Sequence, residues 1–180
     1  MKITLKDGSV KEYAEAKSIY EIALDISEGL ARVACAAEVD GKVVDLRTVV
    51  DSDCELSILT ANDKAGLATL RHTTAHVMAE AVKRLFPDAK LTIGPSIDNG
   101  FYYDFFGIIL KEEDLPKIET EMQKIIAMDL PIIRSELSRS QARELFETKG
   151  EKYKVELIDD LPSDIATVSI YTQGDYVELC

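Results

Sequence analysis

The stretch RHTTAHVMAEAVKRLFPDAKLTIGPSIDNGFYYDFF, residues 71–106, decides the fold of the larger part of this chain and contains both of its histidines. Residues 67–86 are good helix formers and Pro87 stops the run, which predicts a long helix. His72 and His76 stand four residues apart and therefore share one helical face. The histidines lie away from the helix's predicted apolar stripe, so they are not directed into its own core. The apolar stripe consists of Leu67, Leu70, Ala75, Met78, Ala81, Val82 and Leu85.

A hairpin is expected after this helix. Residues 91–97 are typical of a strand, Asp98-Asn99-Gly100 of a tight turn, and residues 101–106 of a returning strand. Four of the five aromatic side chains of the second strand are expected to be core residues on alternating faces: Tyr102, Tyr103, Phe105 and Phe106. The pattern predicts a helix followed by a hairpin, with the histidine pair facing whatever covers the sheet.

The first sixty residues predict a small domain with one helix on a mixed sheet. Strands are expected at 2–6, 9–13, 32–39, 42–44 and 55–59, with tight turns at Asp7-Gly8 and Asp40-Gly41. Ser18 and Glu21 form a capping-box pattern at the start of a helix that Gly29 is placed to end. This order of elements is that of a ubiquitin-like β-grasp.

The last third of the chain alternates between helical and strand patterns. Helices are expected at 112–128 and 139–148, and also at 152–158, where a strand is the alternative. Strands are expected at 130–137, 166–172 and 176–180, which makes this part a two-layer α+β domain. The polar segment ANDKAG marks the boundary, so the predicted division is 1–61, a connector at 62–66, and 67–180.

Composition excludes several classes of protein. Thirty-three acidic and 21 basic residues give a net charge of −12, which argues against a DNA-binding protein or any broad phosphate-binding surface. The chain has an odd number of cysteines, Cys35, Cys54 and Cys180, and they lack CxxC spacing. We therefore expect no disulfide framework, and we expect the protein to reside in a reducing cytoplasm. The sequence has neither a signal-peptide pattern nor the ~20 apolar residues that cross a membrane.

Two groups of motifs resemble known families. HTTAH followed by IGPSIDNGFYYDFF resembles the opening of the editing domain of threonyl-tRNA synthetases, which is related to that of alanyl-tRNA synthetases and of free-standing editing proteins. The DGS turn, the SIYEIALDIS helix and the AEVDGKVVDL hairpin resemble the TGS domain, a module also found in some GTPases. The resemblance covers essentially the whole chain and implies the N-terminal part of a bacterial-type threonyl-tRNA synthetase.

The resemblance implies a set of catalytic residues. The family's motifs assign roles to His72, His76, Lys154 in YKVEL and Cys180, and to Glu178, where many members have Asp. The implied reaction is hydrolysis of the ester in seryl-tRNA(Thr), whose acceptor end is the implied partner. Such a site is needed because one missing methyl gives a binding pocket only ~10–200-fold discrimination.

The resemblance also implies what this chain lacks. In the family the strand DYVELC continues as CRGPH, so the chain is expected to be a truncated part of the synthetase, without its catalytic and anticodon-binding domains. It is therefore expected not to charge tRNA and to need no cofactor, since the family's zinc and its ATP-magnesium belong to the absent catalytic domain. That domain forms the family's homodimer, so a monomer is expected here.

Other interpretations remain open. Histidines at this spacing are common surface residues, Lys154 and Glu178 could be ordinary charged residues, and Cys180 a plain strand residue. Two histidines and a cysteine also suit zinc, as in alanyl-type relatives, which makes His72, His76 and Cys180 the second-choice metal ligands. The competing functions are a free-standing, zinc-dependent aminoacyl-tRNA deacylase and a non-catalytic tRNA- or partner-binding module.

Overall fold

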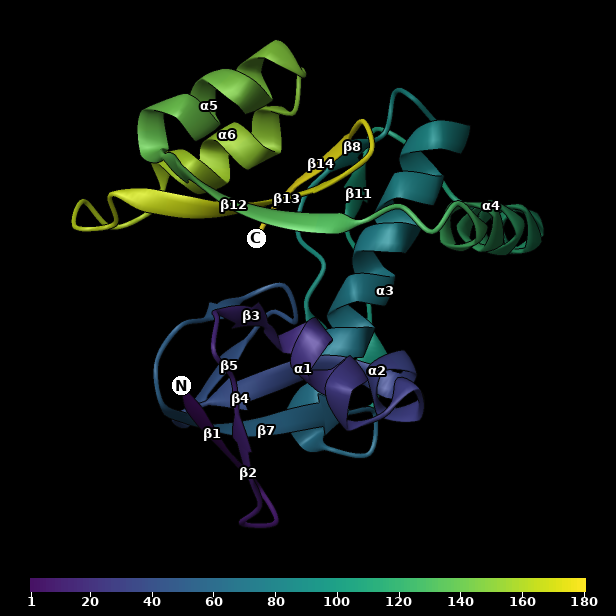
Figure 1. The fold of residues 1–180 in the computed structure, drawn as a ribbon. Helices are drawn as coiled ribbons and strands as arrows, with labels where there is room; N and C mark the ends of the chain where they lie inside the picture. The colour runs from purple at the N-terminus through teal and green to yellow at the C-terminus, as the bar shows by residue number, and fades with distance from the viewer. The chain divides into compact units, whose positions relative to one another are not determined.

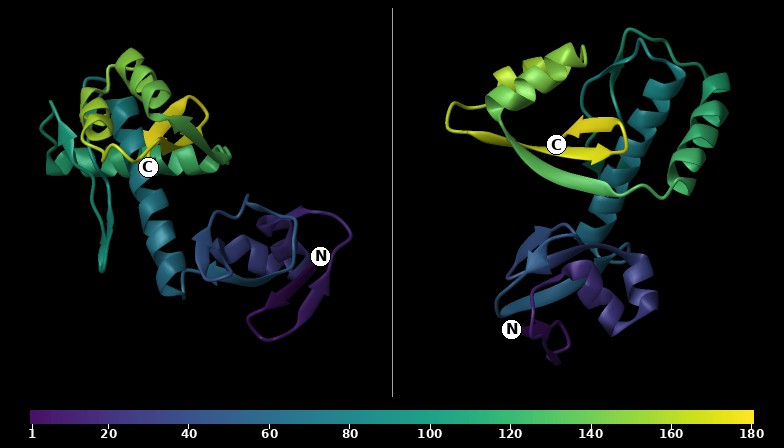
Figure 2. Two further views of the ribbon diagram at one scale, coloured as in Figure 1. Left: turned by 90° about the vertical axis from the view of Figure 1, so that its left-hand side faces the viewer. Right: turned by 45° about the horizontal axis from the view of Figure 1, so that its top comes forward.

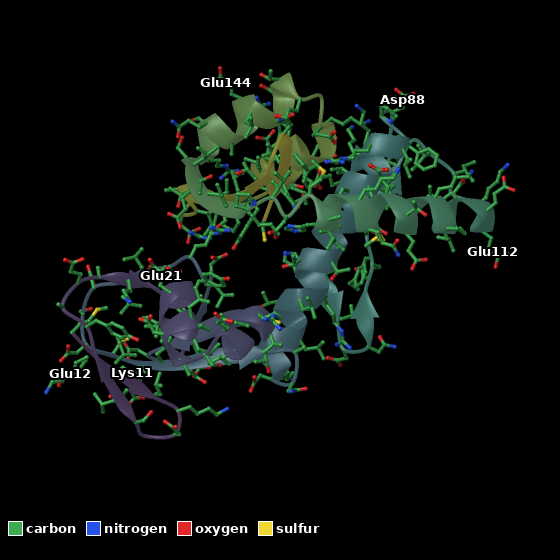
Figure 3. The ribbon with its side chains drawn as sticks, turned by 45° about the vertical axis from the view of Figure 1, so that its right-hand side comes forward. Lys11, Glu12, Glu21, Asp88, Glu112 and Glu144 are labelled. Atoms are coloured by element: carbon green, nitrogen blue, oxygen red, sulfur yellow. The ribbon has the colours of Figure 1, made fainter.

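The computed structural model describes residues 1–180 and divides into two compact units, Met1–His72 and Thr73–Cys180. Figure 1 labels the helices and strands, and Figure 2 gives two further views. Charged side chains such as Glu12, Asp88 and Glu112 are exposed and point outward (Figure 3). None of the helices combines the length and the apolar character that crossing a membrane requires.

The first unit is built on a mixed five-stranded sheet. Its order is β2-β1-β7-β4-β5, in which β1 and β7 are parallel and the other neighbours antiparallel. Helix α1 (Ile19–Ile26) lies on this sheet and buries Ile19 and Ile22 against Ile3 and Leu56. The predicted β-grasp is therefore confirmed. The strands are β1 (Lys2–Leu5), β2 (Val10–Glu12), β4 (Ala34–Val39), β5 (Lys42–Val44) and β7 (Cys54–Thr60).

Local signals explain the ends of α1. Ser18 and Glu21 form the predicted capping box, with the Ser18 N–H donating to the Glu21 carboxylate at 2.8 Å. The predicted end at Gly29 is wrong, because Ser27 ends α1 and its Oγ accepts a hydrogen bond from Leu30 N at 3.0 Å. That cap starts a second helix, α2 (Glu28–Val33), where the sequence predicted the beginning of a strand.

A short strand pair was also not predicted. Strand β3 (Lys17–Ser18) pairs antiparallel with β6 (Val49–Val50), separately from the five-stranded sheet. Each of these strands has only two residues, which is too short for an alternating pattern to be recognised.

Helix α3 (Lys64–Leu85) begins three residues earlier than predicted. Gly66 therefore lies inside the helix and not in a connector. A Cβ atom at Gly66 would stand 2.1 Å from the carbonyl oxygen of Thr60, so only glycine fits this close approach. The non-helical connection between β7 and α3 shrinks to residues 61–63.

The predicted hairpin after α3 is present but interrupted. It consists of two short antiparallel pairs, β8 (Lys90–Leu91) with β11 (Phe105–Phe106) and β9 (Ser96–Ile97) with β10 (Gly100–Phe101). Between the pairs the two segments stay joined, since Asp104 N donates to Ile93 O at 3.0 Å. A Cβ at Gly94 would stand 2.1 Å from the Tyr103 ring, so this glycine lets the ring come close to the backbone.

The rest of the second unit is an α+β layer pair. Strands β12 (Ile132–Ser138), β13 (Thr167–Gln173) and β14 (Tyr176–Leu179) form an antiparallel sheet in that order. Helices α5 (Arg139–Thr148) and α6 (Lys152–Asp159) cover one face of it, as Figure 1 shows. Their shared core contains Ala142, Phe146, Val155, Ile158 and Ile170. A turn at η1 (Glu112–Asp114) leads into α4 (Leu115–Ala127), which packs on α3 through Ile118 and Ile125.

Some residues predicted as core are exposed. The middle of α3 is buried at Ala75, Val77, Ala79, Ala81 and Val82, because two separate apolar clusters cover it on different sides. The buried residues of α3 are therefore not confined to the single predicted stripe, and the stripe is exposed toward the two ends of the helix. The exposed residues are Leu70, Leu85, Tyr102 and Phe106.

Candidate active site

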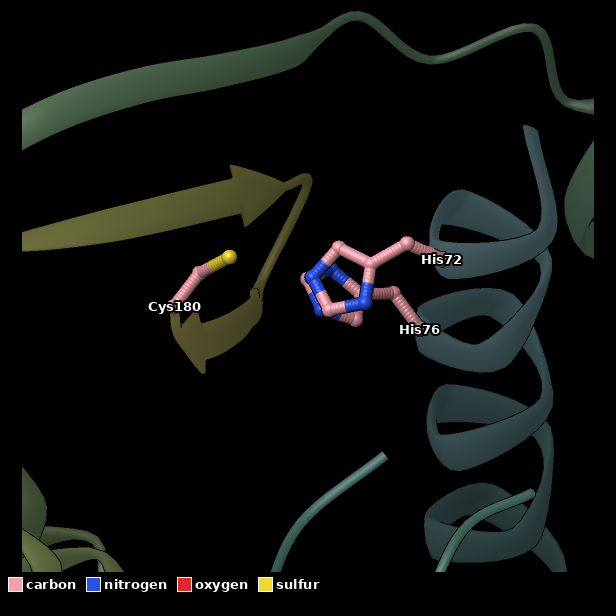
Figure 4. Close-up of side chains that lie close together, drawn as sticks. All are labelled: His72, His76 and Cys180. Carbon is pink, nitrogen blue, oxygen red and sulfur yellow. The ribbon is translucent and has the colours of Figure 1, made fainter. Parts of the chain in front are cut away.

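Helix α3 and the residue after strand β14 bring together three of the predicted site residues. His72 and His76 are partly buried on α3, and one nitrogen of each ring and the sulfur of Cys180 lie within 4.8 Å of one another. Figure 4 shows the Cys180 side chain pointing from the strand side toward the two imidazoles. The four-residue spacing brings the histidines together, whereas the cysteine arrives from more than a hundred residues away.

Side chains alternate between the two faces of β14, which explains why Cys180 faces the histidines. Val177 and Leu179 pack into the core beneath α5 and α6. Tyr176 packs instead against the cluster that contains Ala75 and Ala79 of α3. Successive side chains of a strand point to opposite faces, so Tyr176, Glu178 and Cys180 share one face. The Cys180 N–H donates to Ser169 O at 2.9 Å, which continues the pairing with β13 past the end of β14.

The other two predicted residues form a buried ion pair. Lys154 of α6 and Glu178 of β14 are in direct contact, and their side chains are only 3% and 2% exposed. The Lys154 Nζ also donates to the Tyr103 hydroxyl at 2.9 Å. Tyr103 in turn donates to Glu178 Oε2 at 3.0 Å, and the Tyr176 hydroxyl donates to the same oxygen. Both oxygens of the buried carboxylate are thus hydrogen-bonded, which is the condition for keeping a charge in the interior.

Burial sets the protonation of the groups around this pair. It raises the pKa of Tyr103 and that of Tyr176, and the negative charge of Glu178 raises both further. Both phenols therefore stay protonated at neutral pH and remain donors. Cys180 as a residue is exposed, but the packing around its thiol raises the pKa of that group, as does the charge of Glu178, while Lys154 and Arg134 oppose the shift. Cys180 is consequently a neutral thiol and not a thiolate nucleophile.

The ion pair and the histidine–cysteine cluster are adjacent. Glu178 stands two residues before Cys180 on the same strand face and contacts Lys154, so the pair lies beside the cluster. The structure therefore collects the five predicted residues into two neighbouring groups. Their catalytic roles stay a prediction.

Several surrounding residues were not predicted to belong to the site. The His76 ring meets the Tyr171 ring edge-on at 6.2 Å between centroids. Glu80, one helical turn after His76, is buried and paired with Arg84 at 2.6 Å, but its Oε2 has no hydrogen-bond partner. Tyr103 was predicted as a core residue, with an aromatic ring lining the cleft as the alternative. For Tyr176 the signal was its place two residues before Glu178 on the same strand face.

The donor set has the chemistry of a partial zinc site. Two imidazole nitrogens and one sulfur within 4.8 Å would supply three ligands of a tetrahedral ion. Zinc binding would require the Cys180 thiol to lose its proton, against the effects of burial and of Glu178.

Comparison with known proteins agrees with this architecture. Residues 1–60 match the sequence model of the TGS domain. Over its whole length it is similar to threonine--tRNA ligases. It is 53% identical to that of Clostridioides difficile over 181 residues, 55% to that of Acetivibrio thermocellus over 185, and 54% to that of Desulforamulus reducens over 181. Each match covers 100% of this chain but only 28% of the relative. The resemblance to threonyl-tRNA synthetases seen in the motifs is thus confirmed.

Proposed function

We propose that this chain, with residues of α3 and of the second unit, hydrolyses the ester of seryl-tRNA(Thr), as the editing part of a threonyl-tRNA synthetase. The observation that supports this most is the gathering of His72, His76 and Cys180 next to the buried pair of Lys154 and Glu178. The relatives are enzymes named for attaching threonine to tRNA, which gives the substrate class. Because the chain spans only 28% of their length, charging of tRNA is assigned to regions outside it.

Ester hydrolysis requires a positioned water molecule, a base and hydrogen-bond donors for the oxyanion. Water adds to the ester carbonyl carbon, the bond from that carbon to the ribose oxygen breaks, and the proton lost by water goes to the ribose oxygen. A base must take the proton, and donors must stabilise the oxyanion that forms in between. An imidazole can accept a proton near neutral pH, so we assign His72 and His76 to positioning and deprotonating water.

Lys154 and Cys180 have supporting roles in this proposal. Glu178 and the Tyr103 hydroxyl take two of the three N–H groups of the Lys154 ammonium, which leaves one to donate toward substrate. Its positive charge favours an oxyanion nearby. Cys180, as a neutral thiol, is suited to forming the wall of the pocket and not to attack.

The charge of the chain limits how RNA is bound. A net charge of −12 does not favour a broad contact with phosphates. We therefore propose that this chain contacts only the acceptor end of tRNA(Thr) and that other regions of the synthetase supply most of the affinity.

Deacylation of Ser-tRNA(Thr) tests the proposal. The chain, and a version extended past Cys180 as in the relatives, are compared with His72→Ala and His76→Ala. Lys64→Ala, an exposed change at the start of α3, is the matched control, and Thr-tRNA(Thr) is the control substrate. We expect serine-selective hydrolysis that falls at least ~100-fold in either histidine variant. Equal rates in the histidine variants and the parent would contradict the assignment, and inactivity of every form would favour a binding module.

A zinc-dependent deacylase is the second candidate, favoured by the close donor set of His72, His76 and Cys180. Metal analysis of the purified protein and deacylation after chelation distinguish the two. Stoichiometric zinc, with activity lost on chelation and restored by zinc alone, would replace the metal-free mechanism.

A further inference from the structure

We infer that Tyr176 is a positioning residue: its hydroxyl fixes the Glu178 carboxylate against Lys154, and its ring holds β14 on α3, which keeps Cys180 opposite His72 and His76. The inference rests on the proposed function for its kinetic consequence. Its structural part can be tested without any activity.

The position of β14 needs support beyond the sheet. The strand has four residues, lies at the edge of its sheet and pairs only with β13. Short edge strands have one neighbour to hold them, and Cys180 follows directly after this one. A small shift of β14 would therefore move the thiol relative to both imidazoles.

Tyr176 contacts the two groups that such a shift would separate. Its ring packs against the cluster containing Ala75 and Ala79, the α3 residues on either side of His76. Its hydroxyl donates to Glu178, two residues along the same strand face. One side chain thereby joins the helix that carries the histidines to the carboxylate that holds Lys154.

The hydrogen bonds of Glu178 show what the hydroxyl contributes. Oε1 accepts from Lys154, and Oε2 accepts from Tyr103 and Tyr176. The terminal torsion of a glutamate is soft, so its carboxylate orientation is set by its partners. Without the Tyr176 hydroxyl, Oε2 of Glu178 accepts a hydrogen bond from Tyr103 alone, and Tyr103 lies outside β14. The carboxylate can then turn, and the Lys154 ammonium that it holds turns with it.

Tyr176→Phe removes only the hydroxyl and keeps the ring. We expect kcat for Ser-tRNA(Thr) hydrolysis to fall about tenfold with KM unchanged, because a hydrogen bond to a buried charge is lost while the substrate pocket stays. Tyr153→Phe is the matched control, since Tyr153 precedes Lys154 on α6 but its ring meets Phe106 edge-on. In Glu178→Gln, adding Tyr176→Phe should cost nothing further, because Tyr176 acts through Glu178. Independent, multiplying losses would overturn the inference, as would an unchanged kcat.

A spectroscopic readout separates this inference from the proposed function. A buried, hydrogen-bonded ammonium exchanges its protons slowly, so Lys154 should give a resolved 1H–15Nζ NMR signal in the whole chain. We expect Tyr176→Phe to broaden or shift that signal, and Tyr153→Phe to leave it unchanged. If the chain does not deacylate Ser-tRNA(Thr) but the signal responds in this way, the proposed function fails and the positioning role stands. An unaltered signal in Tyr176→Phe refutes the role, whatever the activity.

Discussion

Removing the cation from the buried pair should destabilise the second unit strongly. Lys154→Met keeps most of the apolar volume of the side chain but leaves Glu178, 2% exposed, without its positive partner. Breaking a buried pair by removing one member costs about 3–5 kcal/mol. Tyr103 and Tyr176 still donate to the carboxylate, so we expect a loss near the lower end, about 3 kcal/mol. For a domain of this size that corresponds to a fall in Tm of roughly 10–20 °C.

The control for this prediction is the same substitution at an exposed pair. Lys124 contacts Glu121 at 2.9 Å, but its side chain is 65% exposed. Lys124→Met should therefore change stability by less than about 0.5 kcal/mol. Thermal unfolding followed by near-UV circular dichroism reports mainly the second unit, because Tyr13 and Tyr20 are the only tyrosines of the first. Equal Tm values for the two variants would refute the view that Lys154 neutralises a buried charge.

Two further predictions concern packing and thiol chemistry. Gly66→Ala should destabilise the first unit by at least about 2 kcal/mol, because the new methyl would overlap the Thr60 carbonyl. Gly29→Ala, whose Cβ would have no atom nearer than 3.9 Å, should be neutral or slightly stabilising; urea unfolding of both variants measures the contrast. The raised pKa of Cys180 lowers its thiolate fraction at pH 8, so iodoacetamide should alkylate it more slowly than free cysteine. The alkylation rate of Cys180 should still increase with pH where the rate of free cysteine has reached its plateau. Peptide mass spectrometry at a series of pH values measures this rate. A plateau at the same pH as for free cysteine would contradict the raised pKa.

Local signals accounted for much of the fold. The Ser18–Glu21 capping box and the Asp40-Gly41 turn, where both residues have positive φ, depend on neighbours in sequence and were predictable. Helix α5 begins and ends where its pattern indicates, with Ser138 as its N-cap. The misplaced start of α3 has a different cause. Gly66 usually signals a break, but here it permits the close approach of Thr60, a contact that no local pattern contains.

The candidate site also combines features that local sequence predicts with features that depend on tertiary contacts. The shared face of His72 and His76 follows from helical periodicity alone. The proximity of Cys180 to them came only from family resemblance, since it depends on how β14 meets α3. The links of Tyr103 and Tyr176 to Glu178 were missed, because a tyrosine among apolar residues looks like core until its hydroxyl's partner is known.

The alternation along β14 also bears on how this strand can evolve. Tyr176, Glu178 and Cys180 lie on one face, and Val177 and Leu179 on the other. A point substitution affects one side chain, but inserting or deleting a single residue would exchange the two faces, burying charge under α5 and turning the aliphatic residues toward the histidines. Related sequences should therefore vary in residue type along this strand but not in length. Insertions should collect in the exposed turn at Gly174, before the alternation begins.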